Sequence, residues 1–343
     1  METNFKYFKS DTVDSFIHSK DFKDIRSTKQ EGVLKLPSGE YKISWDPQQH
    51  PHVSPINPND FSEKDATRLQ GKLEGTRNAI FLPLPTFNLL GLVSSENIMR
   101  ANNNKDMLPL ICNEPETLKT SLDNLIASYE TPFDFENFDD GSKPPEITPE
   151  QAKTIAQLKN IKILNKDALK ALRADDKLYI AGHGEAGDPL LRGTPLDPFN
   201  SFDDVNNEED VDYTTAESIA KSLKGYVPEN FSRFYTLTCH SAEARHPISL
   251  EPEALNNAAT SNLNNDGKIA YAQRFANALQ NEGFTNTSVT GYFGAIGVDD
   301  STKMHKTELK LQSNHDVENI ENDVKQIEIV GKRLKHTMMP QNS

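Results

Sequence analysis

Apolar runs alternate with amphipathic stretches over the middle of the chain, and this alternation predicts the secondary structure. Two runs, residues 177–184 and 233–241, are rich in aromatic and β-branched residues, which is typical of buried strands in a parallel sheet. Shorter strands are expected at residues 161–164 and 289–295. Helical patterns precede or separate these strands, at residues 150–158, 166–172, 214–223 and 267–281. Strands that alternate with helices indicate βαβ units, so we predict an α/β fold with a mainly parallel sheet flanked by helices.

The first half of the chain is less regular. Residues 33–36 and 41–45 flank a Pro-Ser-Gly turn and predict a hairpin, which a proline-rich connector follows. Further on, the pattern predicts a helix, a strand that Pro83 would confine to a sheet edge, a second strand and another helix, at residues 60–73, 78–84, 107–112 and 113–129.

The pattern divides the chain into three parts. Residues 1–75 form a small N-terminal module of unknown role. Residues 76–300 form the α/β domain, which includes an acidic, proline-containing loop at residues 130–149. Residues 301–343 are expected to be a polar, partly helical tail. The 343 residues are enough to bury a full α/β core beside a small second module.

Charge and composition exclude several classes of protein. Residues 130–150 carry seven acids against one lysine, and residues 201–212 carry six acids and no base, so together they supply −12 of the net charge of −14. Acidic loops repel phosphates, which argues against nucleic-acid binding. No apolar run reaches the roughly 18 residues of a membrane span, and the first residues lack the pattern of a secretory signal. Two cysteines make no disulfide framework, so we expect a reducing compartment.

Candidate chemistry lies at the C-terminal ends of the two long apolar runs. One run ends at His183 and the other at Cys239, and side chains at the carboxyl ends of parallel strands meet at one edge of the sheet. A thiol beside an imidazole is the material of a cysteine nucleophile. Gly184 would leave a bare N–H facing the substrate, as an oxyanion donor must. Singly, each residue reads as a buried thiol or a strand-end histidine; their matching positions favour a catalytic pair.

These residues resemble the blocks of the caspase-like (clan CD) cysteine peptidases. Residues 180–184 look like the His-Gly block of that family, and residues 236–239 look like its cysteine block. Residues 269–276 and 289–292 are similar to the helix and strand that follow the cysteine in bacterial members. The resemblance covers about residues 150–300 and is nearest to the self-processing cysteine protease domains of bacterial toxins. It implies a caspase-like fold for the 76–300 domain, which would be catalytic.

The resemblance also implies roles for individual residues. His183 would be the general acid/base, Cys239 the nucleophile, and the N–H groups of Gly184 and Cys239 the oxyanion hole. Asp299 and Asp300 are candidates for lining a pocket that takes a basic residue, although a solvated loop pair is the favoured interpretation of them. His240 departs from the family pattern, because several members have small residues or Arg-Gly after the cysteine. It would either disturb the oxyanion geometry or point away from it.

Partners and location follow from the same resemblance. The substrate would be a protein or peptide, with no cofactor required and with inositol hexakisphosphate as a hypothetical activator. The bases available for that anion are Lys303, Lys306, Lys310, Lys332, Arg333 and Lys335. Self-processing at the 130–149 or 198–212 loop is a further hypothesis. A bacterial effector that acts in the cytoplasm, or is delivered into a host cell without a signal peptide and acts on a host protein, would fit the composition.

Three other interpretations remain open or are disfavoured. A metal-dependent hydrolase would recruit His183, Cys239, His240 and His246, or His50 and His52. An α/β-hydrolase is disfavoured, because Leu237 stands where its nucleophile elbow needs glycine. A catalytically inactive caspase-like interaction module is the main alternative to a peptidase.

Overall fold

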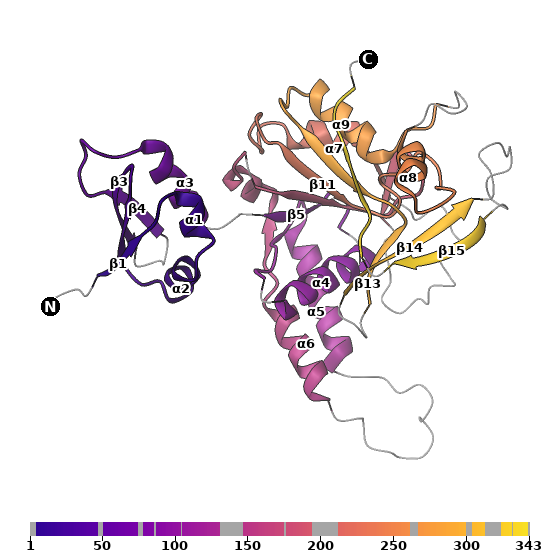
Figure 1. Ribbon diagram of the computed structural model, residues 1–343. Coiled ribbons are helices and arrows are strands. Elements are labelled where there is room, and N and C mark those ends of the chain that lie inside the picture. Colours follow the sequence, from indigo (N-terminus) through magenta and orange to yellow (C-terminus); the bar gives the residue numbers. More distant parts are fainter. Residues whose placement is uncertain are drawn as a thin grey trace, which may run out of the picture. The chain divides into compact units, whose positions relative to one another are not determined.

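The chain divides into two compact units, Met1–Arg77 and Asn78–Ser343 (Figure 1). The structure is a computed structural model. It describes residues 5–46, 51–74, 78–85, 87–103, 105–130, 147–174, 176–193, 212–260, 267–299, 304–312, 324–330 and 332–341. In this part of the chain, each unit has hydrophobic clusters of its own.

The first unit packs helices against a four-stranded sheet of order β1-β2-β3-β4. Its elements are β1 (Lys6–Lys9), α1 (Val13–Ile17), α2 (Lys20–Thr28), β2 (Gly32–Leu36), β3 (Gly39–Trp45), β4 (Pro51–Pro55) and α3 (Glu63–Glu74). The predicted hairpin is confirmed as β2–β3, which turns at Gly39, whose φ of 131° favours glycine. The predicted proline-rich connector is partly wrong, because it contains β4. A sheet edge tolerates the prolines of β4.

The second unit is built around a seven-stranded sheet of order β16-β12-β11-β8-β5-β6-β7. These strands are β5 (Ala79–Leu82), β6 (Leu110–Cys112), β7 (Ile163–Asn165), β8 (Leu178–Ala181), β11 (Arg233–Leu237), β12 (Ser288–Tyr292) and β16 (Lys335–Met338). Every neighbouring pair is parallel except β12 and β16. The predicted α/β class, with its mainly parallel sheet, is therefore confirmed.

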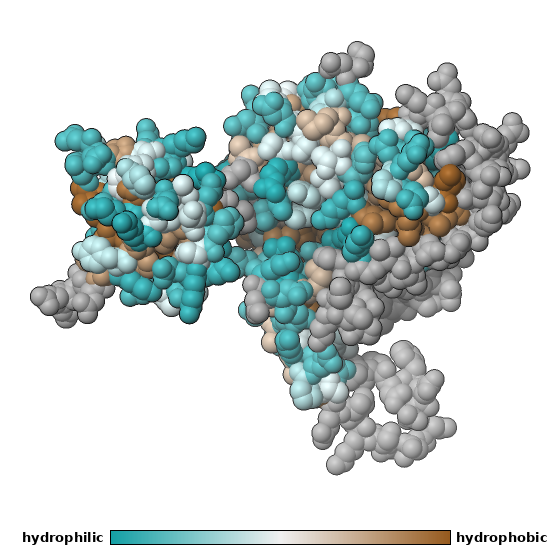
Figure 2. Space-filling view, viewed as in Figure 1, coloured by the Kyte–Doolittle hydropathy of each residue, from teal (hydrophilic) through white to brown (hydrophobic). Residues whose placement is uncertain are grey.

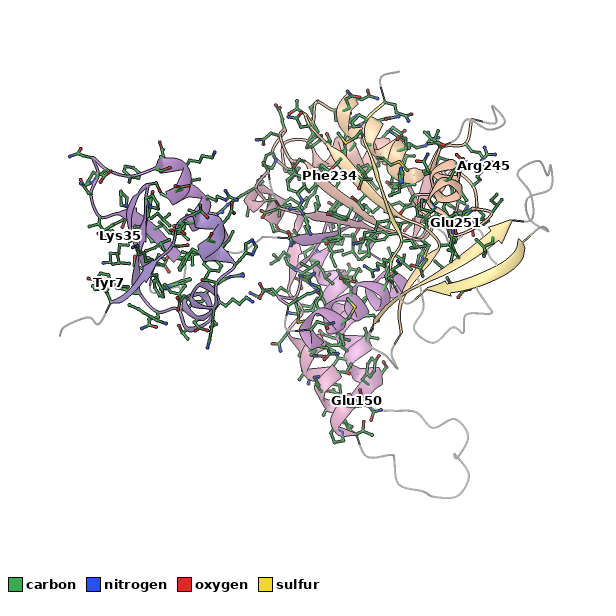
Figure 3. The ribbon with its side chains drawn as sticks, viewed as in Figure 1. Tyr7, Lys35, Glu150, Phe234, Arg245 and Glu251 are labelled. Atoms are coloured by element: carbon green, nitrogen blue, oxygen red, sulfur yellow. The ribbon has the colours of Figure 1, made fainter. Side chains whose placement is uncertain are left out.

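Two core clusters lie on the two faces of this sheet, as in other α/β proteins. The helices are α4 (Phe87–Asn102), α5 (Pro115–Glu130), α6 (Pro149–Lys159), the 3₁₀ helix η1 (Lys166–Ala171), α7 (Ala216–Leu223), α8 (Pro252–Ala259) and α9 (Tyr271–Asn281). In Figure 1, α7 and α9 lie on one side of β11, and α4, α5 and α6 lie on the other. Phe234 of β11 points to the α9 side, where its ring meets that of Phe275 at 5.7 Å (Figure 3).

The predicted edge position of the strand near Pro83 is wrong. β5 lies between β8 and β6, inside the sheet. It ends at Leu82, one residue before the proline, so the missing N–H of Pro83 removes no hydrogen bond from the ladder.

The predicted polar, partly helical tail at residues 301–343 is also wrong. β14 (Met304–Gln312) and β15 (Val324–Val330) form an antiparallel sheet with β13 (Ala295–Asp299), and β16 joins the central sheet. Along β14, Thr307, Leu309 and Leu311 are buried, and Lys310 between the two leucines is exposed. This alternation with a period of two is the pattern of a strand with one buried face.

The surface of the second unit has apolar side chains beside α8. Figure 2 shows hydrophobic residues gathered on the visible face of this region. Ile248 and Leu250, which precede α8, are 37% and 39% exposed. The loop that contains them begins at the end of β11, so it connects this surface to the carboxyl edge of the sheet.

Candidate active site

The structure places His183 and Cys239 at equivalent positions beyond two neighbouring strands. β8 and β11 are paired in parallel, and the last partners in register are Ala181 and Leu237. His183 and Cys239 each follow their strand's last paired residue by two positions. Both therefore lie at the carboxyl edge of the sheet, where open α/β proteins bind their ligands.

Strand alternation places the two side chains on one face of the sheet. Tyr179 and Ala181 of β8, like Leu237 and Cys239 after them in the chain, pack into the cluster on the α4–α5 side. Gly182 faces the opposite way, because a Cβ there would lie 2.8 Å from Leu191 of the other cluster. The next residue, His183, continues the extended backbone by bridging to Arg192. Alternation then turns its side chain to the face of Cys239.

Arg192, which forms the bridge with His183, belongs to a further strand at the carboxyl edge of the sheet. β9 (Leu190–Gly193) pairs with β10 (Asp212–Thr215) in an antiparallel ribbon. The N–H of His183 donates to the Arg192 carbonyl at 3.0 Å, and the Arg192 N–H donates to the His183 carbonyl at 3.0 Å. The backbone of His183 is thus held on both sides, by its own strand and by β9.

Burial holds both groups of the pair in their neutral forms. Burial lowers the pKa of the His183 imidazole, and its Nε2 atom is buried with no hydrogen-bond partner among the described residues. Burial raises the pKa of the Cys239 thiol, against the opposing effect of the backbone N–H groups of Ile296 and of Cys239 itself. No hydrogen bond joins the imidazole to the thiol in the described part of the chain. The resting pair is consequently a thiol and an unbonded imidazole.

Gly184 lies directly against the backbone of Cys239. A Cβ at this position would stand 2.7 Å from Thr238 Cγ2 and 3.3 Å from the Cys239 carbonyl oxygen, so only glycine fits without a shift. Within the described residues, neither the Gly184 N–H nor the Cys239 N–H donates to a backbone carbonyl. N–H groups that do not donate to backbone carbonyls are the donors that an oxyanion would need, although the Cys239 N–H interacts with its own thiol in this structure.

His240 points away from this pair. Its backbone has a φ of 53°, in the left-handed region, and its N–H donates to the Gly294 carbonyl at 2.8 Å. Its imidazole is directed to Glu243, with Nδ1 3.1 Å from Oε1. Of the two expectations for His240, the geometry fits the second, in which the side chain turns away from the oxyanion donors.

Sequence reasoning missed Glu243, which joins His240 to His246. The carboxylate is fully buried and also lies 2.9 Å from Nδ1 of His246. The signal was present as three residues at intervals of three, but it stands in a loop where no helical or strand pattern predicts that the side chains converge. The structure brings His240 and His246 together through Glu243. The metal-dependent hydrolase considered from the sequence would instead have combined these histidines with His183 and Cys239.

Several predicted site features fall wholly or partly outside the described residues. Asp299 ends β13 and pairs with Met304, but its side chain is outside the described part, as is the whole of Asp300. Most of the two candidate processing loops, at residues 131–146 and 194–211, is outside it too, and so is His50.

The basic cluster expected to hold an activating anion is only partly free. Arg333 is buried and lies 2.9 Å from the carboxylate of Glu96, and its guanidinium packs over the ring of Tyr292 at 5.4 Å. Lys335 lies over the same ring at 5.7 Å. Lys310 on β14 is exposed, whereas Lys303 lies outside the described residues.

Comparison with known proteins gives no family for this chain. In the part of the chain that the structure describes, no helix is long and apolar enough to cross a bilayer. No protein-family model and no curated protein matches the chain. A function for this protein can therefore be inferred only from the geometry at His183 and Cys239.

Proposed function

We propose that the protein is a caspase-like cysteine endopeptidase of clan CD with a His183–Cys239 dyad. One observation carries the proposal: the two residues extend by the same two positions beyond paired parallel strands. Their side chains then project to one face at the edge where α/β enzymes act. Gly184 and its unused N–H beside the cysteine add the donor that acyl transfer needs.

The chemistry follows from the protonation states. Because both groups rest neutral, the imidazole acts as a general base at the moment of attack and does not hold a preformed thiolate. Cys239 Sγ adds to the scissile carbonyl carbon while His183 takes the thiol proton. The N–H groups of Gly184 and Cys239 hold the resulting oxyanion. The C–N bond then breaks as His183 returns the proton to the leaving amine, and a thioester remains.

Hydrolysis of the thioester completes the cycle. His183 takes a proton from a water molecule, whose oxygen adds to the thioester carbon. The C–S bond then breaks, and the thiol recovers its proton from the imidazolium. No third residue is required, because the backbone bridge to Arg192 already holds His183.

Substrate and setting belong to the same proposal. The substrate is a protein or peptide, including a host protein if the chain is a bacterial effector, and the 130–149 and 198–212 loops are candidate sites of self-processing. Inositol hexakisphosphate as activator is the weaker element, because Arg333 is already paired with Glu96. An unchanged melting temperature in its presence would argue against it.

An inactive caspase-like interaction module is the second candidate. It is favoured by the partly buried thiol, whose pKa burial raises, and by the missing hydrogen bond between Cys239 and His183. The apolar side chains beside α8 would then belong to a docking surface.

Cleavage of a mixed peptide library by the full chain distinguishes the two candidates. The proposal expects new peptide termini with wild type, with and without inositol hexakisphosphate, and none with Cys239→Ala. Cys112→Ala is the matched control, because this second thiol is fully buried in β6 and should not affect cleavage. Equal cleavage by wild type and Cys239→Ala would exclude the dyad, and no cleavage by either would favour the interaction module.

A further inference from the structure

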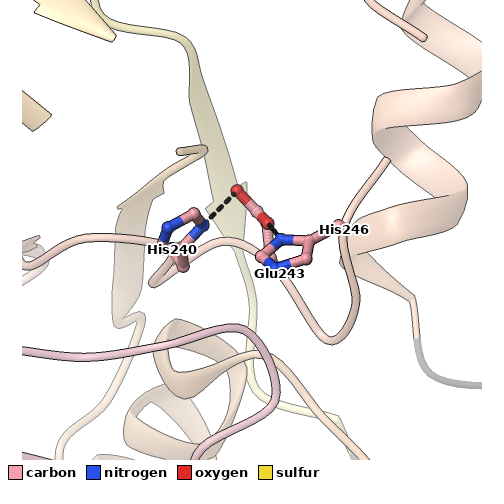
Figure 4. A group of neighbouring side chains, drawn as sticks. All are labelled: His240, Glu243 and His246. Atoms are coloured by element: carbon pink, nitrogen blue, oxygen red, sulfur yellow. Dashed lines mark hydrogen bonds and ion pairs between the residues drawn. The ribbon is translucent and has the colours of Figure 1, made fainter. Parts of the chain in front are cut away.

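Three potential metal ligands converge in the loop after Cys239. His240, Glu243 and His246 are spaced three residues apart, and the carboxylate of Glu243 lies between the two imidazoles (Figure 4). One ligand atom from each residue lies within 4.8 Å of the other two. The group is distinct from the proposed dyad, because its side chains are directed to one another.

The distances approach those that a transition metal requires. Bonds of about 2.0–2.1 Å put the ligand atoms of a tetrahedral site about 3.3 Å apart. Nδ1 of His240 is 3.1 Å from one oxygen of Glu243, and Nδ1 of His246 is 2.9 Å from the other. The three ligand atoms, one from each residue, lie within 4.8 Å of one another, so they need to move closer by at most about 1.5 Å.

Charge and burial favour a cation at this place. Glu243 is fully buried, and its carboxylate is hydrogen-bonded to both histidines and to the Gly294 N–H. Two imidazole nitrogens and a carboxylate oxygen form the donor set that Zn²⁺, Co²⁺ and Ni²⁺ share. The imidazoles need only exchange the N–H from Nδ1 to Nε2 to present their lone pairs.

The surroundings fix two ligands and leave the third accessible. The Gly294 N–H donates to Glu243, and the Gly294 carbonyl accepts from the backbone of His240, so this turn orients both residues. His246 has a side chain that is 15% exposed. It therefore provides the path by which an ion enters and the freedom to close the remaining distance.

We infer that His240, Glu243 and His246 form a binding site for a divalent transition metal of the Zn²⁺ class. The ion links the loop after Cys239 more tightly to the turn at Gly294. The site does not depend on the peptidase proposal, since its ligands and the dyad share no side chain.

Metal titration of the Cys239→Ala chain tests the site, because the thiol can then supply no ligand. After treatment with a chelator, Zn²⁺ should bind at one equivalent and raise the melting temperature. Co²⁺ should give the visible bands of a tetrahedral site without a thiolate charge-transfer band. His246→Ala and Glu243→Gln should each weaken binding by at least about 100-fold. His18→Ala removes an exposed histidine of the first unit and should change nothing.

Two results would overturn the inference. One is binding that wild type shows and Cys239→Ala lacks, which would assign the ion to the thiol. The other is unchanged affinity in His246→Ala and Glu243→Gln when circular dichroism shows both variants folded. Since no activity is measured, failure of the metal site leaves the peptidase proposal intact, and failure of the peptidase proposal leaves the metal site intact.

Discussion

The proposed dyad and the histidine–glutamate cluster contrast, although Cys239 directly precedes His240 in the chain. At His183 a buried imidazole nitrogen has no partner, and the N–H groups of Gly184 and Cys239 donate to no backbone carbonyl among the described residues. At Glu243 the carboxylate accepts from two histidines and a backbone N–H. Buried polar groups without partners cost stability, so a fold retains them where a ligand completes the bonding. Under the proposed function, the contrast separates a region that would bind substrate from a region that fixes the loop.

The largest effect is expected from His183→Ala. It should lower the rate of peptide cleavage about 10²- to 10⁴-fold, because the general base is lost. The free energy of unfolding should change by no more than about 1 kcal/mol, since no hydrogen bond at Nε2 is broken. Steady-state kinetics and urea unfolding of the same variant measure the two effects. If His183→Ala lost stability and kept full activity, His183 would have a structural role and no catalytic role.

Glu243→Ala should lower stability more than His183→Ala does. It removes the shared acceptor of two histidines and of the Gly294 N–H, so the free energy of unfolding should fall by about 3 kcal/mol or more. Glu243→Gln should lose less, because the amide oxygen still accepts from Gly294. Urea unfolding in the presence of a chelator measures both. Equal stability of wild type and Glu243→Ala would show that the cluster does not hold the loop.

Two glycine substitutions sharpen the contrast at the dyad. Gly184→Ala places a methyl group 2.7 Å from Thr238 Cγ2 and should destabilise the protein by about 1–3 kcal/mol while lowering kcat. Gly91→Ala is the matched control, because its Cβ in α4 meets no atom within 4 Å. The control should stabilise the protein by up to about 1 kcal/mol. If Gly184→Ala kept full stability and activity, the backbones of Gly184 and Cys239 could not lie as close together as the structure shows.

The smallest effect is a shift in pH dependence. Because burial lowers the pKa of His183 from 6.5, more than half of the imidazole is neutral at pH 6.5. The acidic limb of kcat/KM should therefore have its midpoint below pH 6.5. The same group should contribute stability that is fully present above pH 6.5 and is lost as the pH falls through its lowered pKa. An acidic limb centred above pH 6.5 would contradict the lowered pKa of a partly buried His183 whose Nε2 has no hydrogen-bond partner among the described residues.

The central sheet could be predicted from the sequence, because strands of a parallel sheet that are buried on both faces consist of continuous apolar runs. The predicted runs, residues 177–184 and 233–241, contain the observed strands, Leu178–Ala181 and Arg233–Leu237, which end before His183 and Cys239. The helix α4 was not predicted, since its apolar residues lie on no single face and the pattern therefore lacks helical periodicity. β14 was missed because lysine and glutamate alternate with its buried residues, so the segment resembles a polar tail.

The candidate site could be predicted only in part. Strand ends locate His183 and Cys239, because a parallel sheet aligns its carboxyl ends whatever the loops do. The role of Glu243 depends on the turn at Gly294, which lies 51 residues further along the chain, and on the left-handed backbone of His240. Neither has a local pattern in the sequence.

The most direct test is the intact mass of the protein after treatment with a peptidyl acyloxymethyl ketone, followed by mapping of the modified residue. The account predicts one adduct, on Cys239, that disappears in Cys239→Ala and forms far more slowly in His183→Ala. Cys112, which is fully buried in β6, should stay unmodified. No adduct on Cys239, or one that forms equally fast without His183, would contradict the dyad.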